Sequence, residues 1–248
     1  MSAPNFLSLK DGTRLAYKKV DGKTPTVIWC GGLKSDMEGS KALHLEQWAR
    51  ESGQAYIRFD YFGHGVSDGD FIEGTISRWA SDVTAVISEL CEGDIILVGS
   101  SMGGWASLLA AIDMPNRVKA MVLINPAPDF TEKLTRTKWT AEQEAELLEN
   151  GVVYEPSGYD EPYAYSKKLM DDGKAQRILD RPIPLTCPIR ILQGANDDVV
   201  PPRHSQLIVE AVASQDVIYS LIKGGDHSLS REEDLKTLSR CLDEFTVS

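Results

Sequence analysis

Short, almost wholly apolar runs recur along the chain, and segments with helical periodicity separate them. The runs are rich in Val and Ile and are bounded by Gly, Pro or Asp, which is typical of strands buried on both faces of a sheet. They predict strands at Thr26–Trp29, Ala55–Phe59, Asp94–Val98, Ala120–Ile124, Ile189–Leu192 and Val217–Ile222. Two further runs, near Phe6–Leu9 and Arg14–Lys18, are joined by Asp11-Gly12, which predicts a hairpin near the start of the chain.

The segments between these runs have the spacing of amphipathic helices. Within Ile76–Leu90, for example, Trp79 and Val83 fall on one helical face. A last helix is predicted to begin with Ser230 and Glu233, which are spaced as a capping box. Alternating strands and helices imply a mostly parallel sheet with helices on both faces. The chain is therefore predicted to form an α/β fold around an eight-stranded sheet.

The stretch from residue 127 to residue 185 breaks this rhythm, because it contains no convincing strand. A helix is predicted from Thr140, with Gln143 completing a capping box, to Asn150-Gly151. Roughly 60 residues is too long for an ordinary connection in an α/β fold. We interpret the stretch as a helical lid inserted into a single domain of residues 1–248. The alternative is a helical excursion that only packs against the core.

One strand-to-helix junction carries the sharpest chemical signal, Gly99-Ser100-Ser101-Met102-Gly103 after the strand Asp94–Val98. The pattern G-x-S-x-G in this context is typical of a nucleophile elbow, whose glycines allow the sharp turn that exposes the central hydroxyl. The turn also directs the backbone N–H of Met102 toward a forming oxyanion, where the helix N-terminus favours negative charge. The alternative is a plain tight turn in which Ser101 only caps the helix.

A serine nucleophile needs a general base, and the chain contains four histidines. His227 follows the last predicted strand, at the carboxyl end where open α/β sheets place their active sites. His64 stands between two glycines on another loop and is the alternative base. His44 and His204 fall in predicted helices and are interpreted as surface or packing residues.

The base in turn needs a carboxylate that fixes its tautomer and stabilises the imidazolium. Asp197 and Asp198 both follow a predicted strand, and one of them is expected to take this role. The order serine, aspartate, histidine along the chain is that of α/β hydrolases. A second oxyanion donor is expected from the segment Cys30-Gly31-Gly32-Leu33, namely the N–H of Leu33, with that of Gly32 as the second choice.

Composition narrows the classes of function. The net charge of −11 over 248 residues, without a basic run, argues against a nucleic-acid partner. No apolar run approaches the roughly 20 residues that a membrane span needs. Four widely spaced cysteines predict buried thiols in a reducing compartment, with neither a disulfide framework nor a zinc site: Cys30, Cys91, Cys187 and Cys241. We expect a cytoplasmic protein that needs no metal and no organic cofactor.

Four segments spread over nearly the whole chain resemble the α/β-hydrolase superfamily: Gly99–Gly103, Asp60–Ser67, Gly194–Pro201 and Asp226-His227. In that superfamily the aspartate stands three residues after the glycine of G-x-x-D-x-x-V-P. The resemblance therefore selects Asp197 over Asp198 as the acid. It also implies the α/β-hydrolase fold, with helices on both faces of the sheet and a lid between two strands.

A narrower set resembles the mitochondrial abhydrolase-domain subgroup described as acyl-protein thioesterases and acyl-glucuronide esterases: Ser35–Leu43, Ile57–Tyr61, Gly99–Trp105 and Cys187–Arg190. The resemblance implies hydrolysis of palmitoyl-type thioesters or acyl glucuronides, so that the partner is a small-molecule or acylated substrate. The N-terminus lacks the layout of a presequence, and we therefore expect a bacterial-type relative of this subgroup.

Together these residues predict a serine hydrolase that cleaves carboxylic esters or thioesters through an acyl-enzyme. Ser101, Asp197 and His227 are its expected catalytic residues. His64, Tyr163 and Tyr165 are expected to line the substrate pocket. The alternatives are a non-hydrolytic lyase or perhydrolase, and a ligand-binding receptor that uses the same pocket.

Overall fold

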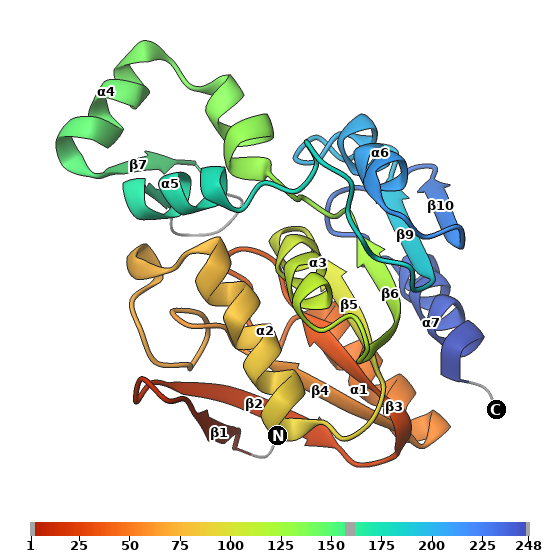
Figure 1. The fold of residues 1–248 in the computed structure, drawn as a ribbon. Coiled ribbons are helices and arrows are strands. Elements are labelled where there is room, and N and C mark those ends of the chain that lie inside the picture. The colour runs from red at the N-terminus through yellow and green to blue at the C-terminus, as the bar shows by residue number, and fades with distance from the viewer. Residues whose placement is uncertain (1–2, 157–161, 247–248) are drawn as a thin grey trace.

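The computed structural model describes residues 3–156 and 162–246 and is built around one eight-stranded sheet (Figure 1). Its strand order is β1-β2-β4-β3-β5-β6-β9-β10. The pairs from β4 to β10 are parallel, whereas β2 is antiparallel to both β1 and β4. The predicted mostly parallel, eight-stranded sheet is therefore confirmed. The strands are β1 (Asn5–Ser8), β2 (Arg14–Val20), β3 (Lys23–Cys30), β4 (Gln54–Phe59), β5 (Ile95–Ser100), β6 (Val118–Ile124), β9 (Ile189–Gly194) and β10 (Val217–Ile222).

Helices cover both faces of this sheet because its central strands are apolar at nearly every position. In β5, Ile95 and Leu97 belong to the core on one face, whereas Ile96 and Val98 belong to the core on the other. The first core is shared with α2 (Ile76–Leu90), α3 (Met102–Asp113) and α6 (Pro202–Ala211). The second core is shared with α1 (Ser40–Ser52) and α7 (Glu232–Thr246).

The start of α7 differs from the prediction. The helix begins at Glu232, and the backbone N–H of Arg231 donates to the Asp234 carboxylate at 3.1 Å. The Ser230 hydroxyl instead exchanges hydrogen bonds with Ser228. The predicted capping box of Ser230 and Glu233 is therefore wrong, because the helix starts one residue later: Arg231 stands at the N-cap, and Asp234 takes the place predicted for Glu233.

The segment between β6 and β9 forms a separate layer, which we call the cap (residues 131–175). It consists of η2 (Thr131–Thr135), η3 (Arg136–Lys138), α4 (Ala141–Asn150), β7 (Val152–Glu155), β8 (Tyr163–Ser166) and α5 (Lys167–Ala175). In Figure 1, α4, β7 and α5 lie together, beyond the ends of α2 and α3. The capping box of Thr140 and Gln143 is confirmed, and α4 ends at Gly151 in a left-handed conformation with φ 77°.

The hairpin formed by β7 and β8 is a departure from the predicted absence of strands in this stretch. The two strands have four residues each and pair with one another, apart from the main sheet. Strands this short offer too few alternations to be recognised from periodicity. The prediction of a helix for α4 is correct, but the insertion as a whole is a mixed helix and hairpin.

A buried carboxylate joins the two ends of the cap. Asp129, which is fully buried, accepts hydrogen bonds from the backbone N–H groups of Ile178 at 2.9 Å and Leu179 at 3.0 Å. At the surface beside it, Lys133 forms an ion pair with Asp180 at 2.7 Å. The chain thus enters and leaves the cap at one point, which we call the cap root (Asp129, Ile178 and Leu179).

Candidate active site

Ser101 stands at a strained turn between β5 and α3. Its φ of +54° lies in the left-handed region, which a residue other than glycine seldom occupies. A Cβ atom at Gly103 would overlap the backbone carbonyl oxygens of Cys30 and Gly31, so this position has room for glycine alone. A Cβ atom at Gly99 would lie 2.7 Å from the carbonyl oxygen of Gly103. The two glycines of the motif thus allow the turn that places Ser101 above the end of the sheet.

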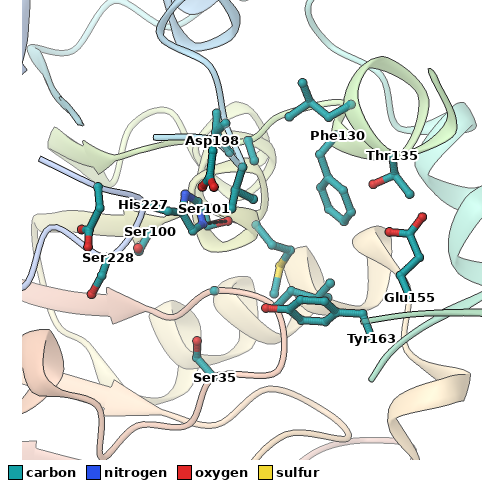
Figure 2. A pocket seen from close by; sticks show the side chains of 18 of the residues that line it. Ser35, Ser100, Ser101, Phe130, Thr135, Glu155, Tyr163, Asp198, His227 and Ser228 are labelled. Atoms are coloured by element: carbon teal, nitrogen blue, oxygen red, sulfur yellow. Dashed lines mark hydrogen bonds between the residues drawn. The ribbon is translucent and has the colours of Figure 1, made fainter. Parts of the chain in front are cut away.

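Three side chains from three strand ends meet at this turn. The His227 Nε2 atom lies 3.2 Å from the Ser101 Oγ atom, and its Nδ1 atom lies 2.8 Å from the Asp197 Oδ2 atom. Figure 2 shows the imidazole of His227 beside Ser101. Ser101 follows β5, Asp197 follows β9 and His227 follows β10. The structure therefore brings together the three residues singled out from the sequence.

The choice between the two neighbouring aspartates is clear in the structure. The side chain of Asp197 is fully buried, and its Oδ1 atom accepts hydrogen bonds from the backbone N–H groups of Val199 at 2.9 Å and Val200 at 2.8 Å. Asp198 is exposed and lies on the wall of the adjacent cavity (Figure 2). Asp197 is thus the carboxylate that can hold the Nδ1 proton of His227, as the resemblance implied.

The loop after β3 lies against the same serine. A Cβ atom at Gly32 would be 3.4 Å from the Cβ atom of Ser101, and both Gly32 and Leu33 line the cavity that contains Ser101. Met102 is the first residue of α3, where a backbone N–H has no partner inside its own helix. Gly32, Leu33 and Met102 therefore all line the cavity beside Ser101, and their role as oxyanion donors stays a prediction. The preference for Leu33 over Gly32 stays a prediction.

His64 does not line the cavity, and the prediction that it does is wrong. It is 3% exposed, and its ring packs among the rings of Tyr61, Phe71 and Trp79. Its Nε2 atom accepts a hydrogen bond from the backbone N–H of Lys34 at 3.1 Å, and its Nδ1 atom lies 3.1 Å from the carbonyl oxygen of Phe62. Burial lowers the pKa of His64 to about 4, so the ring is neutral near pH 7.

This arrangement gives His64 a different place in the site. The accepting Nε2 atom holds the residue that directly follows Leu33, and therefore the loop expected to supply an oxyanion donor. The glycines on either side of His64 both have positive φ values, 69° for Gly63 and 49° for Gly65. They turn the side chain inward, away from the cavity. The pattern Gly-His-Gly alone does not show these backbone angles, so it is equally typical of a histidine that faces a pocket.

A cavity of about 860 Å³ extends from Ser101 to beneath the cap. Tyr163 and Tyr165 line it, as predicted. In Figure 2, Phe130 and Tyr163 face the cavity from opposite sides. Thr135 and Glu155 lie at the side away from Ser101. The cavity therefore has polar residues such as Asp198 around Ser101 and aromatic wall beyond them. Its far end is again polar, and there the Glu155 carboxylate accepts a hydrogen bond from Trp139 at 2.6 Å.

A match to the alpha/beta hydrolase family spans residues 33–238 of the chain. The chain belongs to this family. It is 39% identical over 244 residues to the human protein named palmitoyl-protein thioesterase ABHD10, mitochondrial, and the match covers 97% of this chain and 79% of that protein. Membership of the family and the similarity to this subgroup confirm the resemblance drawn from the sequence.

Solved structures give the same result for the fold. A putative hydrolase from Agrobacterium vitis S4 superposes with a TM-score of 0.93 at 39% identity, covering 97% of each chain. The alpha/beta hydrolase domain-containing protein 10 from mouse superposes with a TM-score of 0.90 at 35% identity, covering 98% of each chain. The chain is thus a hydrolase of the alpha/beta hydrolase family, as its sequence predicted.

Several residues of this hydrolase's cavity were not singled out from the sequence. Lys41, on α1, lines the cavity, and its Nζ atom donates a hydrogen bond to the carbonyl oxygen of Ser228, next to His227. Burial lowers the pKa of Lys41 to about 8. Phe130 and Glu155 belong to the insertion, where the sequence shows no periodicity that distinguishes a cavity wall from a packed core. Lys41 gave no signal either, because a lysine in a helical stretch is typical of an exposed face.

The thiols are mostly as predicted. All four cysteines are free; Cys30, Cys91 and Cys241 are buried, whereas Cys187 is half-buried rather than buried as predicted.

Within residues 3–156 and 162–246, no group of three or more His, Cys, Asp or Glu side chains could hold a metal ion. No helix in those same ranges is long and apolar enough to cross a membrane.

Proposed function

We propose that this alpha/beta hydrolase is a serine hydrolase that cleaves carboxylic esters or thioesters through an acyl-enzyme. The observation that carries the proposal is the chain of contacts from the Ser101 Oγ atom to His227 at 3.2 Å and on to the Asp197 carboxylate at 2.8 Å. Serine alone is a weak nucleophile, and a base oriented by a third group is what activates it.

The first half-reaction acylates the enzyme. The Ser101 Oγ atom attacks the acyl carbon while its proton passes to His227 Nε2, and Asp197 stabilises the resulting imidazolium. The carbonyl oxygen becomes an oxyanion held by the N–H groups of Met102 and Leu33, or Gly32 in place of Leu33. When the tetrahedral intermediate collapses, the bond to the alcohol or thiol breaks and His227 returns the proton to that leaving group.

The second half-reaction regenerates the serine. His227 takes a proton from a water molecule, and the water oxygen attacks the acyl carbon bonded to Ser101. Collapse of this second intermediate releases a carboxylic acid and returns the proton to the Ser101 Oγ atom. All the acid-base steps use one imidazole, so no metal or organic cofactor enters the proposal.

The acyl group is proposed to lie beneath the cap, and the cap to act as a lid. Phe130, Tyr163 and Tyr165 provide aromatic wall there, and apolar wall favours an acyl chain of medium or greater length. The names of the curated relatives support the same class, because they describe palmitoyl-protein thioesterases. The candidate substrates are therefore acyl thioesters, with oxygen esters and acyl glucuronides as the comparison classes. A cytoplasmic location remains a prediction.

The direct test compares Ser101→Ala with Ser81→Ala, since Ser81 is an exposed serine on α2. On an acyl thioester, Ser101→Ala is expected to lower kcat by about 10⁴-fold or more, because it removes the nucleophile on which the other two residues act. Ser81→Ala is expected to have the activity of the unchanged protein. Full activity of Ser101→Ala contradicts the proposal. If the unchanged protein takes up one equivalent of acyl group without turnover, the result favours the ligand-binding receptor instead.

A graded acyl series tests the substrate class separately. With thioesters from two to sixteen carbons, kcat/KM is expected to rise with chain length before it levels off, because each buried methylene contributes about 0.8 kcal/mol. The same series as oxygen esters, and one acyl glucuronide, measures the preference for the leaving group. Activity confined to the shortest chains contradicts the thioesterase proposal but leaves the serine hydrolase intact.

A further inference from the structure

The residues at the end of β6 form hydrogen bonds with all three loops that carry the proposed triad. The backbone N–H of Ser101 donates to the carbonyl oxygen of Ile124 at 3.0 Å, and the N–H of Ala127 donates to the carbonyl oxygen of Ser101 at 3.0 Å. Residues on both sides of Asn125 thus hold the nucleophile's turn through the backbone. Asn125 itself faces the other two loops.

The side chain of Asn125 joins the loop of the acid to the loop of the base. It is fully buried, and its Oδ1 atom accepts a hydrogen bond from the N–H of Gly194 at 2.7 Å. Its Nδ2 atom donates to the carbonyl oxygens of Asp226 at 3.0 Å and His227 at 2.8 Å. Gly194 ends β9, three residues before Asp197. One amide therefore uses both of its donors and its acceptor to tie these two loops together.

The backbone at Asn125 is strained to make these contacts. Its φ is +43°, in the left-handed region, and its N–H donates to the carbonyl oxygen of Leu192 at 2.9 Å. Asparagine tolerates this region better than most residues, yet the conformation still has a free-energy cost. Such strain persists where the surrounding contacts require it, and here the contacts are those of the triad loops.

We propose that Asn125 is a positioning residue that sets the backbone of His227, and through it the distance from His227 Nε2 to Ser101 Oγ. The inference rests on the proposed serine-hydrolase function. The anchored carbonyl belongs to His227 itself, so a shift of that peptide group moves the imidazole directly. The Nε2–Oγ separation is 3.2 Å, at the long end of a hydrogen bond, and a small displacement breaks it.

Replacing Asn125 with aspartate separates this role from simple packing, because the two side chains have the same shape. When ionised, the introduced side chain would place a carboxylate oxygen against the carbonyl oxygens of Asp226 and His227, which repel it. When protonated, it would instead donate its O–H to one of these carbonyls. Burial favours the neutral form of the introduced carboxyl group, so its hydrogen bonding to the two loops is expected to recover in part as the pH falls.

The experiment compares Asn125→Asp with Asn116→Asp, which makes the same charge change at an exposed residue just before the opposite end of β6. Near pH 8, Asn125→Asp is expected to lower kcat about 10²-fold with KM changed less than about threefold, as for a misplacement of about 1 Å in a catalytic group. The deficit relative to the unchanged protein is expected to shrink toward pH 5.5. Asn116→Asp is expected to match the unchanged protein throughout.

Asn125→Gly removes the three side-chain hydrogen bonds of Asn125 and also relieves its strained φ. This variant therefore tests the positioning role without introducing a charge. Its kcat is expected to be low at every pH, with a weakened downfield proton signal from His227 Nδ1. Its Tm is expected to fall, because the N–H of Gly194 and the carbonyl oxygens of Asp226 and His227 lose their partner. An Asn125→Gly variant with kcat within twofold of normal overturns the inference. An Asn125→Asp variant whose kcat deficit is the same from pH 5.5 to pH 8 also overturns the inference. This second result is sufficient by itself if the glycine variant does not fold. Activity retained by Ser101→Ala refutes the proposed function instead.

Discussion

The sheet and the cap share one cavity but hold their side chains in different ways. At the sheet, buried hydrogen bonds fix each group: Asp197 accepts two backbone N–H groups besides contacting His227. The ends of the cap are instead joined to each other, through the buried carboxylate of Asp129 and a surface ion pair between Lys133 and Asp180. The proposed function assigns the chemistry to the sheet and acyl selection to the cap, so we expect the two to be separable by mutation.

The largest effect is expected on the sheet side, from Asp197→Asn. The change keeps the shape of the side chain but no longer favours the Nδ1–H tautomer of His227, and by analogy with other serine triads kcat should fall by about 10⁴-fold. Asp198→Asn is the matched change one residue further on, at an exposed position, and is expected to lower kcat less than tenfold. Equal losses of kcat in the two variants would show that the buried pair of Asp197 and His227 does not take part in catalysis.

A smaller effect on the sheet side concerns pH and stability. The pKa of His64 is about 4 in the folded protein against an ordinary 6.5, so folding disfavours its protonated form. The stability that neutral His64 provides is therefore complete above pH 6.5 and is lost as the pH falls through 6.5 toward 4, by about 3 kcal/mol in all.

Urea unfolding of His64→Gln measures this contribution. Between pH 7 and about pH 4.5, the unchanged protein should lose more free energy of unfolding than His64→Gln, which has no imidazole to protonate at this position. His44→Gln is the control, since His44 is half-buried on α1 beside Ser239. If His64→Gln loses as much stability over this range as the unchanged protein, the buried neutral histidine is not what the pH change acts on.

The smallest effects are expected at the cap root. Asp129→Asn puts an amide N–H₂ group where a carboxylate oxygen accepted a hydrogen bond, so one of the two backbone N–H groups at the cap root loses its partner. The expected cost is about 2 kcal/mol, or roughly 30-fold in local opening of the cap. Asp180→Asn breaks an exposed ion pair beside it and should cost less than about 1 kcal/mol. Hydrogen exchange of cap amides reports both. Exchange that quickens equally in cap and sheet for Asp129→Asn would contradict separate anchoring of the two regions.

The sequence was informative where local geometry depends on residue type. Strands buried on both faces appear as continuous apolar runs, and the glycines around Ser101 mark a turn that other residues cannot make. Asp197 and His227 follow because the carboxyl ends of parallel strands meet at one edge. Asn125 could have been noticed as a polar residue that ends an apolar strand, but nothing in its neighbours shows which loops its amide reaches.

The cap was less predictable because its structure depends on contacts distant in the chain. The strands β7 and β8 are too short for a periodic signal, and they form because they pair with each other and because Tyr165 packs against Trp139. The prediction for His64 was wrong for a related reason, because its ring packs against Phe71 and Trp79, and the residues next to it in the sequence do not show this packing. Long-range packing decides both cases.

Ser101 is proposed to be the reacting nucleophile. The most direct test of this proposal is incubation of the protein with a fluorophosphonate probe, followed by peptide mass spectrometry. We expect one adduct per chain, on the Ser101 Oγ atom, and no adduct in Ser101→Ala. The absence of an adduct on the unchanged protein, or an adduct on Ser100 in place of Ser101, would contradict it.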